Sequence, residues 1–123
     1  MGDQLAISMA AAYGGTVVVA LDGELDLLTV QRAQEVLCGQ VEAGARRLVA
    51  DLSGLRFIGT LGTRLLLDVQ ALLMAQGGSI ALARPQPQVA RLLQLTGADQ
   101  RLPVYDSISA AVRGQVPLLG HAP

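Results

Sequence analysis

The stretch "DLSGLRFIGTLGTRLLLDVQALL", residues 51–73, contains the change of pattern that decides the fold. It begins inside "RRLVADL" (46–52), a continuous apolar run typical of a strand covered on both faces. After Gly59, apolar residues recur at intervals of three and four as far as about Gln76, which is the period of a helix. We therefore expect residues 56–59 to leave the sheet and a helix to begin at about Thr60. Thr60 lies between Gly59 and Gly62.

Strands and helices alternate on both sides of this junction. Short runs rich in β-branched residues are separated by longer segments with helical period, a pattern typical of a mostly parallel sheet. The expected strands are 5–10 and 16–23, joined as a hairpin at Gly14-Gly15, then 46–52, 79–85 and a short edge strand within 101–105. The expected helices are 29–43, 60–76, 87–96 and a last one from Asp106 or Ser107 to about Val112.

The fold class that follows is α/β, with a four- to five-stranded, mostly parallel sheet, an N-terminal hairpin and about four helices. A chain of 123 residues is long enough for one hydrophobic core. We expect residues 1–123 to form one domain, with a core over about 5–113 and a flexible tail over 114–123.

The charged residues argue against two classes of partner. Nine basic and ten acidic residues give a formal net charge of −1, and every basic residue is an arginine. Because these arginines are scattered, no dense basic stripe is available for nucleic acid or for a membrane surface. Aromatic residues, on which bases could stack, make up only 2% of the chain. The composition favours a protein partner.

The sequence contains no predicted membrane span, secretory leader or metal site. Its apolar runs are far shorter than the roughly 20 residues of a spanning helix, and we expect a cytoplasmic protein. Cys38 and His121 are the only cysteine and histidine, so the sequence predicts no internal disulfide and no zinc site. We expect no cofactor, and Cys38 is interpreted as a buried, inert thiol.

Thr60 supports two interpretations at the expected helix start. Its hydroxyl can accept a hydrogen bond from a backbone N–H one turn later, a cap worth about 1 kcal/mol. Alternatively, the hydroxyl is a phosphorylation site, because free amide groups and the positive helix end favour a phosphate there. Spacing alone favours the cap. The segment lacks the longer glycine spacing and the terminal Lys-Ser/Thr of a nucleotide-binding loop.

The carboxylates raise the alternative of an enzyme or a small-ligand domain. Asp22 and Asp26 are expected just beyond the second strand, and Asp51 at the end of the third. Carboxylates at strand ends can bind metal or act as acid and base. However, the pattern pairs no nucleophile with a general base, so we expect no catalysis and interpret Asp26 as part of a turn.

Four motifs together give the chain a resemblance to a known family. They are "GELD" at 23–26 with Thr29 three residues later, "DLSGLRFI" followed by the glycine-bounded helix start, the "GG" before the fourth strand, and "VARLLQLTGAD" in the third helix. In this order they resemble a STAS domain over about residues 5–113. Bacterial anti-sigma factor antagonists are the most similar members.

The resemblance implies a function in transcription regulation through protein–protein interaction. An antagonist of this type captures an anti-sigma factor, often a kinase of the histidine-kinase-like ATPase type, and thereby frees a sigma factor. Phosphorylation of the antagonist ends the capture. The residues that the resemblance and the expected surface assign to partner binding are Asp26, Thr29, Arg56, Gly59, Thr60, Leu61, Gly62 and Arg64.

The chain departs from the family at the phosphorylation motif. The family has Asp-Ser-Ser/Thr-Gly at the start of the second helix, with the phosphate on the first hydroxyl, and this chain has Gly59-Thr60-Leu61-Gly62. Two hypotheses follow: an anti-sigma factor antagonist switched by phosphorylation at Thr60, or a STAS scaffold module without a working phosphoswitch. Self-association and the identity of the sigma factor stay open.

Overall fold

The computed structural model describes residues 4–114, so that residues 115–123 of the expected tail lie outside the described part. In chain order the elements are β1 (Leu5–Tyr13), β2 (Thr16–Leu25), α1 (Val30–Glu42), β3 (Arg47–Ile58), α2 (Thr60–Met74), β4 (Ser79–Ala83), α3 (Pro87–Leu95), the 3-10 helix η1 (Ala98–Gln100), β5 (Val104–Tyr105) and α4 (Ile108–Arg113). The longest helix, α2, has 15 residues, and none of the described helices could cross a membrane.

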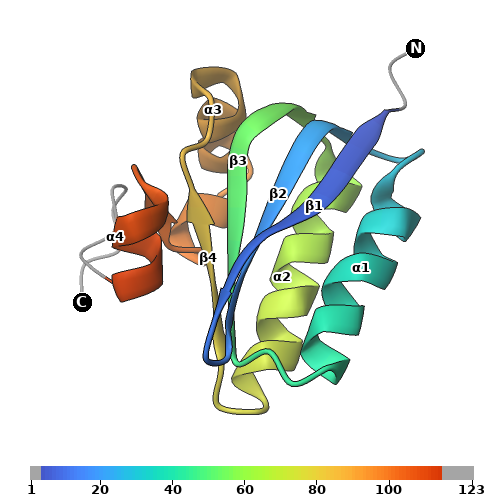
Figure 1. The fold of residues 1–123 in the computed structure, drawn as a ribbon. Helices are drawn as coiled ribbons and strands as arrows, with labels where there is room; N and C mark the ends of the chain where they lie inside the picture. Colours follow the sequence, from blue (N-terminus) through green and yellow to red (C-terminus); the bar gives the residue numbers. More distant parts are fainter. Residues whose placement is uncertain (1–3, 115–123) are drawn as a thin grey trace.

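The five strands form one mixed sheet in the order β1-β2-β3-β4-β5. β1 pairs with β2 in the antiparallel direction, and every other neighbouring pair is parallel. Gly14 and Gly15, both with positive φ, make the hairpin turn between β1 and β2. The fold class expected from the sequence is confirmed, including the N-terminal hairpin and four helices in the described part (Figure 1).

Helices cover both faces of the sheet, but unequally. α1 and α2 lie together on one face, and α4 lies on the other face over β3, β4 and β5 (Figure 1). Alternation along β2 explains the two cores, since Val17, Val19 and Leu21 belong to the larger core whereas Val18 belongs to the smaller one with Val49. The sheet therefore has a hydrophobic core on each of its two faces.

The third strand is longer than the sequence pattern predicts. Its expected range was 46–52, but β3 continues to Ile58 and pairs with β2 as far as Leu25. The exposed residues after 52 interrupt the apolar run, yet Leu55 and Ile58 still reach the core. The prediction that residues 56–58 leave the sheet is therefore wrong, because a neighbouring strand of equal reach holds them in register.

Because β2 and β3 both continue beyond their predicted ends, two of the predicted strand-end carboxylates lie within strands. Asp22 lies within β2, which ends at Leu25, and Asp51 lies inside β3.

The predicted edge strand is reduced to Val104–Tyr105, after Pro103. Ser107, one of the two predicted caps, is the N-cap of α4, and its hydroxyl accepts a hydrogen bond from the N–H of Ala110 at 3.0 Å.

Candidate interaction surface

The predicted site residues lie mainly where β2 and β3 end. Leu25 and Ile58 are register partners, and the N–H of Gly59 donates to the carbonyl of Leu25 at 2.9 Å. The turn from β2 into α1 and the junction from β3 into α2 are therefore neighbours. We call this region the loop-end surface, formed by Asp26, Leu27, Leu28, Arg56, Phe57, Thr60, Leu61 and Arg64.

Helix α2 begins without a side-chain cap. Its N-cap residue is Gly59, in an extended conformation, and Thr60 is the first helical residue. The hydroxyl at the start of the helix that does form a bond belongs to Thr63, which donates to the carbonyl of Gly59 at 3.1 Å. The prediction that the Thr60 hydroxyl caps the helix is wrong, because the extended strand conformation continues through Gly59 and places Thr60 one position too late.

The uncapped start of α2 favours the binding of a negatively charged group. The first-turn amides of a helix have no intrahelical acceptor, and the helix dipole makes this end positive. The first turn of α2 contains no acidic residue, and the side chain of Thr60 is exposed. A phosphate on this hydroxyl would be placed beside amide donors without disturbing the core.

The turn between β2 and α1 is held by Asp26 and Thr29. The Thr29 hydroxyl accepts from the N–H of Asp26 at 3.0 Å and donates to the carbonyl of Glu24 at 2.8 Å. The Asp26 carboxylate accepts from the N–H of Leu28 at 3.0 Å. Because Thr29 is only 2% exposed, its side chain shapes the turn from within.

This turn displays apolar side chains to solvent. Leu27 and Leu28 are 73% and 71% exposed, and Phe57 and Leu61 across the junction are each 43% exposed. These four make up half of the eight exposed large apolar side chains in residues 4–114. A concentration of this kind, surrounded by polar groups, is typical of a protein-binding surface.

The two glycines of the junction have different roles. A Cβ on Gly62 would lie 2.7 Å from Leu25 Cγ and 2.8 Å from the Leu25 carbonyl oxygen, so α2 can approach β2 only because this residue has no side chain. A Cβ on Gly59 would meet only Phe57 Cε2, at 3.4 Å, and Asp26 at 3.8 Å. Packing therefore requires glycine at 62 but not at 59.

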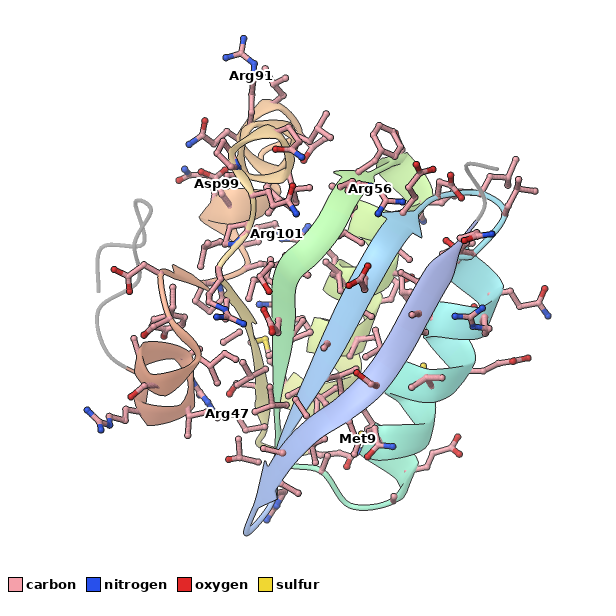
Figure 2. The ribbon with its side chains drawn as sticks, turned by 45° about the horizontal axis from the view of Figure 1, so that its top comes forward. Met9, Arg47, Arg56, Arg91, Asp99 and Arg101 are labelled. Atoms are coloured by element: carbon pink, nitrogen blue, oxygen red, sulfur yellow. The ribbon has the colours of Figure 1, made fainter. Side chains whose placement is uncertain are left out.

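The loop-end surface contains two arginines. Arg56 lies near the end of β3 (Figure 2), and both Arg56 and Arg64 are exposed. Arg64 also lines an open hollow of about 460 Å³ together with Thr60, Thr63 and Arg101. The surface thus combines apolar side chains with positive charge, which favours partners that carry carboxylates around an apolar patch.

Asp51 does not join the loop-end surface. Its carboxylate binds Arg84 through an ion pair of 2.9 Å, and the same arginine donates to the hydroxyl of Ser53. Burial alone would raise the pKa of Asp51, but the hydrogen bonds from Arg84 and Ser53 outweigh it and hold the pKa below its ordinary value. The carboxylate is therefore bound in a structural contact, which removes the predicted support for acid–base chemistry at Asp51.

Sequence reasoning did not identify Arg84 as the partner of Asp51. Arg84 adopts a left-handed conformation with φ of 56°, which is rare outside glycine and is held by its bonds to Asp51 and to the backbone of Tyr105.

Cys38, expected to be buried, is half-buried, and burial raises the pKa of its thiol. This shift disfavours the reactive thiolate.

The family model described as "STAS domain" matches residues 8–111. This chain belongs to the STAS domain family. The matched range contains β2, β3 and the first turn of α2, so the loop-end surface lies inside the family domain.

Individual relatives point in the same direction. BtrV of Bordetella bronchiseptica is 30% identical over 97 residues, covering 79% of this chain and 84% of BtrV. The anti-sigma F factor antagonist of Paenibacillus polymyxa is 30% identical over 100 residues, covering 77% of this chain and 82% of its own. The STAS domain of this chain therefore has curated relatives that are named anti-sigma factor antagonists.

Solved structures show the same fold. An anti-sigma factor antagonist from Mycobacterium paratuberculosis is 24% identical, with a TM-score of 0.83 over 93% of this chain and 96% of its own. The anti-sigma factor antagonist SpoIIAA in its unphosphorylated form is 26% identical, with a TM-score of 0.71 over 92% of this chain and 99% of its own. The arrangement of the five strands is thus shared by both.

Proposed function

We propose that this protein is a cytoplasmic anti-sigma factor antagonist that captures its anti-sigma factor with the loop-end surface. The names of the relatives support the class of function. The observation that supports the location is the group of four exposed apolar side chains, Leu27, Leu28, Phe57 and Leu61, around an uncapped helix start. Capture of the anti-sigma factor releases the sigma factor for transcription.

The eight residues assigned to partner binding divide by their burial. Asp26, Arg56, Thr60, Leu61 and Arg64 offer accessible atoms and make contact in this proposal, whereas Thr29 and Gly62 are buried and act by shaping the surface. Gly59 is half-buried and contributes through its backbone, as the N-cap of α2. Leu27, Leu28 and Phe57 join the contact set, although the sequence motifs did not single them out. Leu27 and Leu28 are two adjacent apolar residues between the predicted strand 16–23 and the predicted helix 29–43, a feature that the sequence contains but that does not by itself show their exposure.

The proposed switch is phosphorylation of Thr60 by a partner of the histidine-kinase-like ATPase type. The Thr60 oxygen bonds to the γ-phosphorus of ATP, the bond to the β-phosphate oxygen breaks, ADP leaves, and the hydroxyl proton passes to a base of the kinase. The product adds about −1.5 to −2 charges next to Leu61. Burying that charge against an apolar or acidic partner is costly, so phosphorylation ends the capture.

A second candidate is an interaction module of the same fold without the switch. It is favoured by the absence of the motif carboxylate at Gly59 and of the second hydroxyl at Leu61. Without these groups a kinase has fewer contacts with which to hold Thr60 in line with ATP. In this case the protein binds its partner permanently and is controlled by its own abundance.

Direct binding measurements test the capture. Purified kinase-like anti-sigma factors from the same genome are titrated with the protein, with Leu28→Ser as the test variant and Leu95→Ser as the control. Leu28 and Leu95 are 71% and 70% exposed, but Leu95 lies on α3. We expect Leu28→Ser and Thr60→Glu to weaken binding by about tenfold or more and Leu95→Ser to leave it unchanged. Failure of every anti-sigma factor to bind would refute the proposal.

Intact-mass measurement separates the switched protein from the unswitched module. The protein is incubated with the anti-sigma factor that binds it and with Mg-ATP, alongside a Thr60→Val variant that keeps the shape but lacks the hydroxyl. A single added phosphate on the wild type, absent from Thr60→Val, supports the switch. An unmodified wild type that still binds supports the permanent module.

A further inference from the structure

The two edges of the sheet are protected very differently. β5 has only two residues, follows Pro103, precedes the exposed Asp106 and is packed against α4. These are the features by which natural sheets avoid pairing with other chains. β1, at the other edge, has nine residues, and within residues 4–114 no segment pairs with its outer side.

β1 also lacks the side chains that usually protect an edge. Its sequence, LAISMAAAY, contains no charged residue and no proline. Ala6, Ser8, Met9 and Ala10 are exposed, and Met9, which lies on the α1 side of β1 (Figure 2), keeps 50% of its surface in solvent. The one protective feature is a register shift between Met9 and Ala11, which interrupts the ladder near its middle.

We propose that the protein pairs with a second copy of itself through the free edge of β1. Two copies of one strand meet about a two-fold axis in the antiparallel direction, which extends the sheet with its strongest type of pairing. A strand that pairs with itself places like side chains near one another, so any charge would repel its own copy. The absence of charge along β1 thus fits a second copy better than a partner selected by opposite charge.

The side chains of β1 add a small apolar contribution to this pairing. Met9 and Val19 are register partners, so the exposed Met9 lies beside the main core and would be covered by the strand of the second copy. The other exposed residues of β1 are small, so the backbone hydrogen bonds must provide most of the affinity. We therefore expect a weak, concentration-dependent dimer.

This dimer leaves the proposed capture surface free. A two-fold axis perpendicular to β1 reverses the direction of β2 and β3 in the second copy. The two loop-end surfaces then lie at opposite ends of the extended sheet, where each can hold one anti-sigma factor. The dimer is independent of the proposed function, since loss of either property leaves the other intact.

Sedimentation velocity of the full chain tests the pairing, from about 10 µM to about 1 mM, the range of weak association. We expect the weight-average mass to rise towards twice the monomer mass in the wild type. Ser8→Lys should raise the dimer dissociation constant by about tenfold or more, because two lysines approach across the new ladder. Gln94→Lys, an equal charge on an exposed position of α3, should have no effect.

Mixing charge variants makes the test specific for β1. Ser8→Lys and Ser8→Glu should each associate more weakly alone than the wild type and should form a heterodimer when mixed, because opposite charges then meet. Circular dichroism confirms that both variants keep the fold. A wild type that stays monomeric at every concentration overturns the proposal. A dimer whose dissociation constant is unaffected by Ser8→Lys also overturns it. Anti-sigma factor binding should be unchanged in the Ser8→Lys variant, so that failure of the dimer proposal can be distinguished from failure of the proposed function.

Discussion

Gly62 and Leu25 approach so closely that a methyl group on Gly62 would lie 2.7 Å from Leu25 Cγ. Leu25 is fully buried at the end of β2, and Gly62 is in the first turn of α2. This contact sets the height of α2 above the sheet and hence the position of Thr60, two residues earlier, at the loop-end surface. The glycine at this point of the family motif is therefore a packing requirement.

Gly62→Ala should destabilise the protein by roughly 1–3 kcal/mol, because the added methyl group displaces Leu25 or α2. Gly39→Ala is the matched control, since Gly39 lies within α1 and a Cβ there has open space. That control should stabilise by about 0.5–1 kcal/mol through helix propensity. Urea unfolding followed by circular dichroism measures both. Equal effects at the two positions would contradict the close packing.

The sequence pattern predicted the elements because periodicity and glycine positions are local signals. The change from strand to helical period after Gly59 placed the start of α2 at Thr60, where the structure has it. The hairpin at Gly14-Gly15 and the cap of the last helix, predicted at Asp106 or Ser107 and found at Ser107, likewise depend on conformations that the local residues themselves favour. These signals required no knowledge of neighbouring strands.

The features that the sequence did not reveal depend on tertiary neighbours. β3 continues to Ile58 because β2 extends beside it, although exposed residues such as Ser53 and Arg56 break the apolar run. Asp51 binds Arg84, which lies 33 residues later in the chain. The left-handed backbone conformation of Arg84 is likewise not indicated by the residues that precede Pro85. The exposure of Leu27 and Leu28 likewise becomes visible only once the turn that holds them is seen.

Thr29→Val should destabilise the protein by about 1–3 kcal/mol, because it leaves the partly buried Asp26 N–H and Glu24 carbonyl without their partner. Thr60→Val is the control, because Thr60 is exposed and caps nothing, and should change the free energy of unfolding by less than about 0.5 kcal/mol. Chemical denaturation compares the two. If both valines have the same effect, the hydroxyl of Thr29 does not hold the turn.

Gly59→Asp should stabilise α2 by a few tenths of a kcal/mol, since an aspartate at the N-cap accepts from the first-turn amides. The position accommodates it, because the backbone is extended and a Cβ makes only ordinary contacts. Gly59→Ala adds the same Cβ without an acceptor and should stabilise less. Under the proposed function, Gly59→Asp also restores a motif carboxylate and should speed phosphate transfer to Thr60. Thermal unfolding and intact-mass time courses measure the two effects separately.

Asp51→Asn should make the stability of the protein less dependent on pH in the acidic range. The folded-state pKa of Asp51 lies below its unfolded value of about 3.9, so its ionised form stabilises the fold at higher pH. That stabilisation is lost as the pH falls through the two values, when the carboxylate takes up a proton and its bonds to Arg84 weaken. The urea midpoint of the wild type should therefore fall between pH 6 and pH 3 more steeply than that of Asp51→Asn.

The control for this pH dependence is Glu35→Gln, which removes an exposed carboxylate on α1 that makes no hydrogen bond within residues 4–114. Its midpoint should follow that of the wild type across the whole range. Arg84→Gln should behave like Asp51→Asn, because the lowered pKa requires the guanidinium as well as the carboxylate. An Arg84→Gln protein with the full wild-type pH dependence would show that a carboxylate other than Asp51 is responsible for the loss of stability at acidic pH.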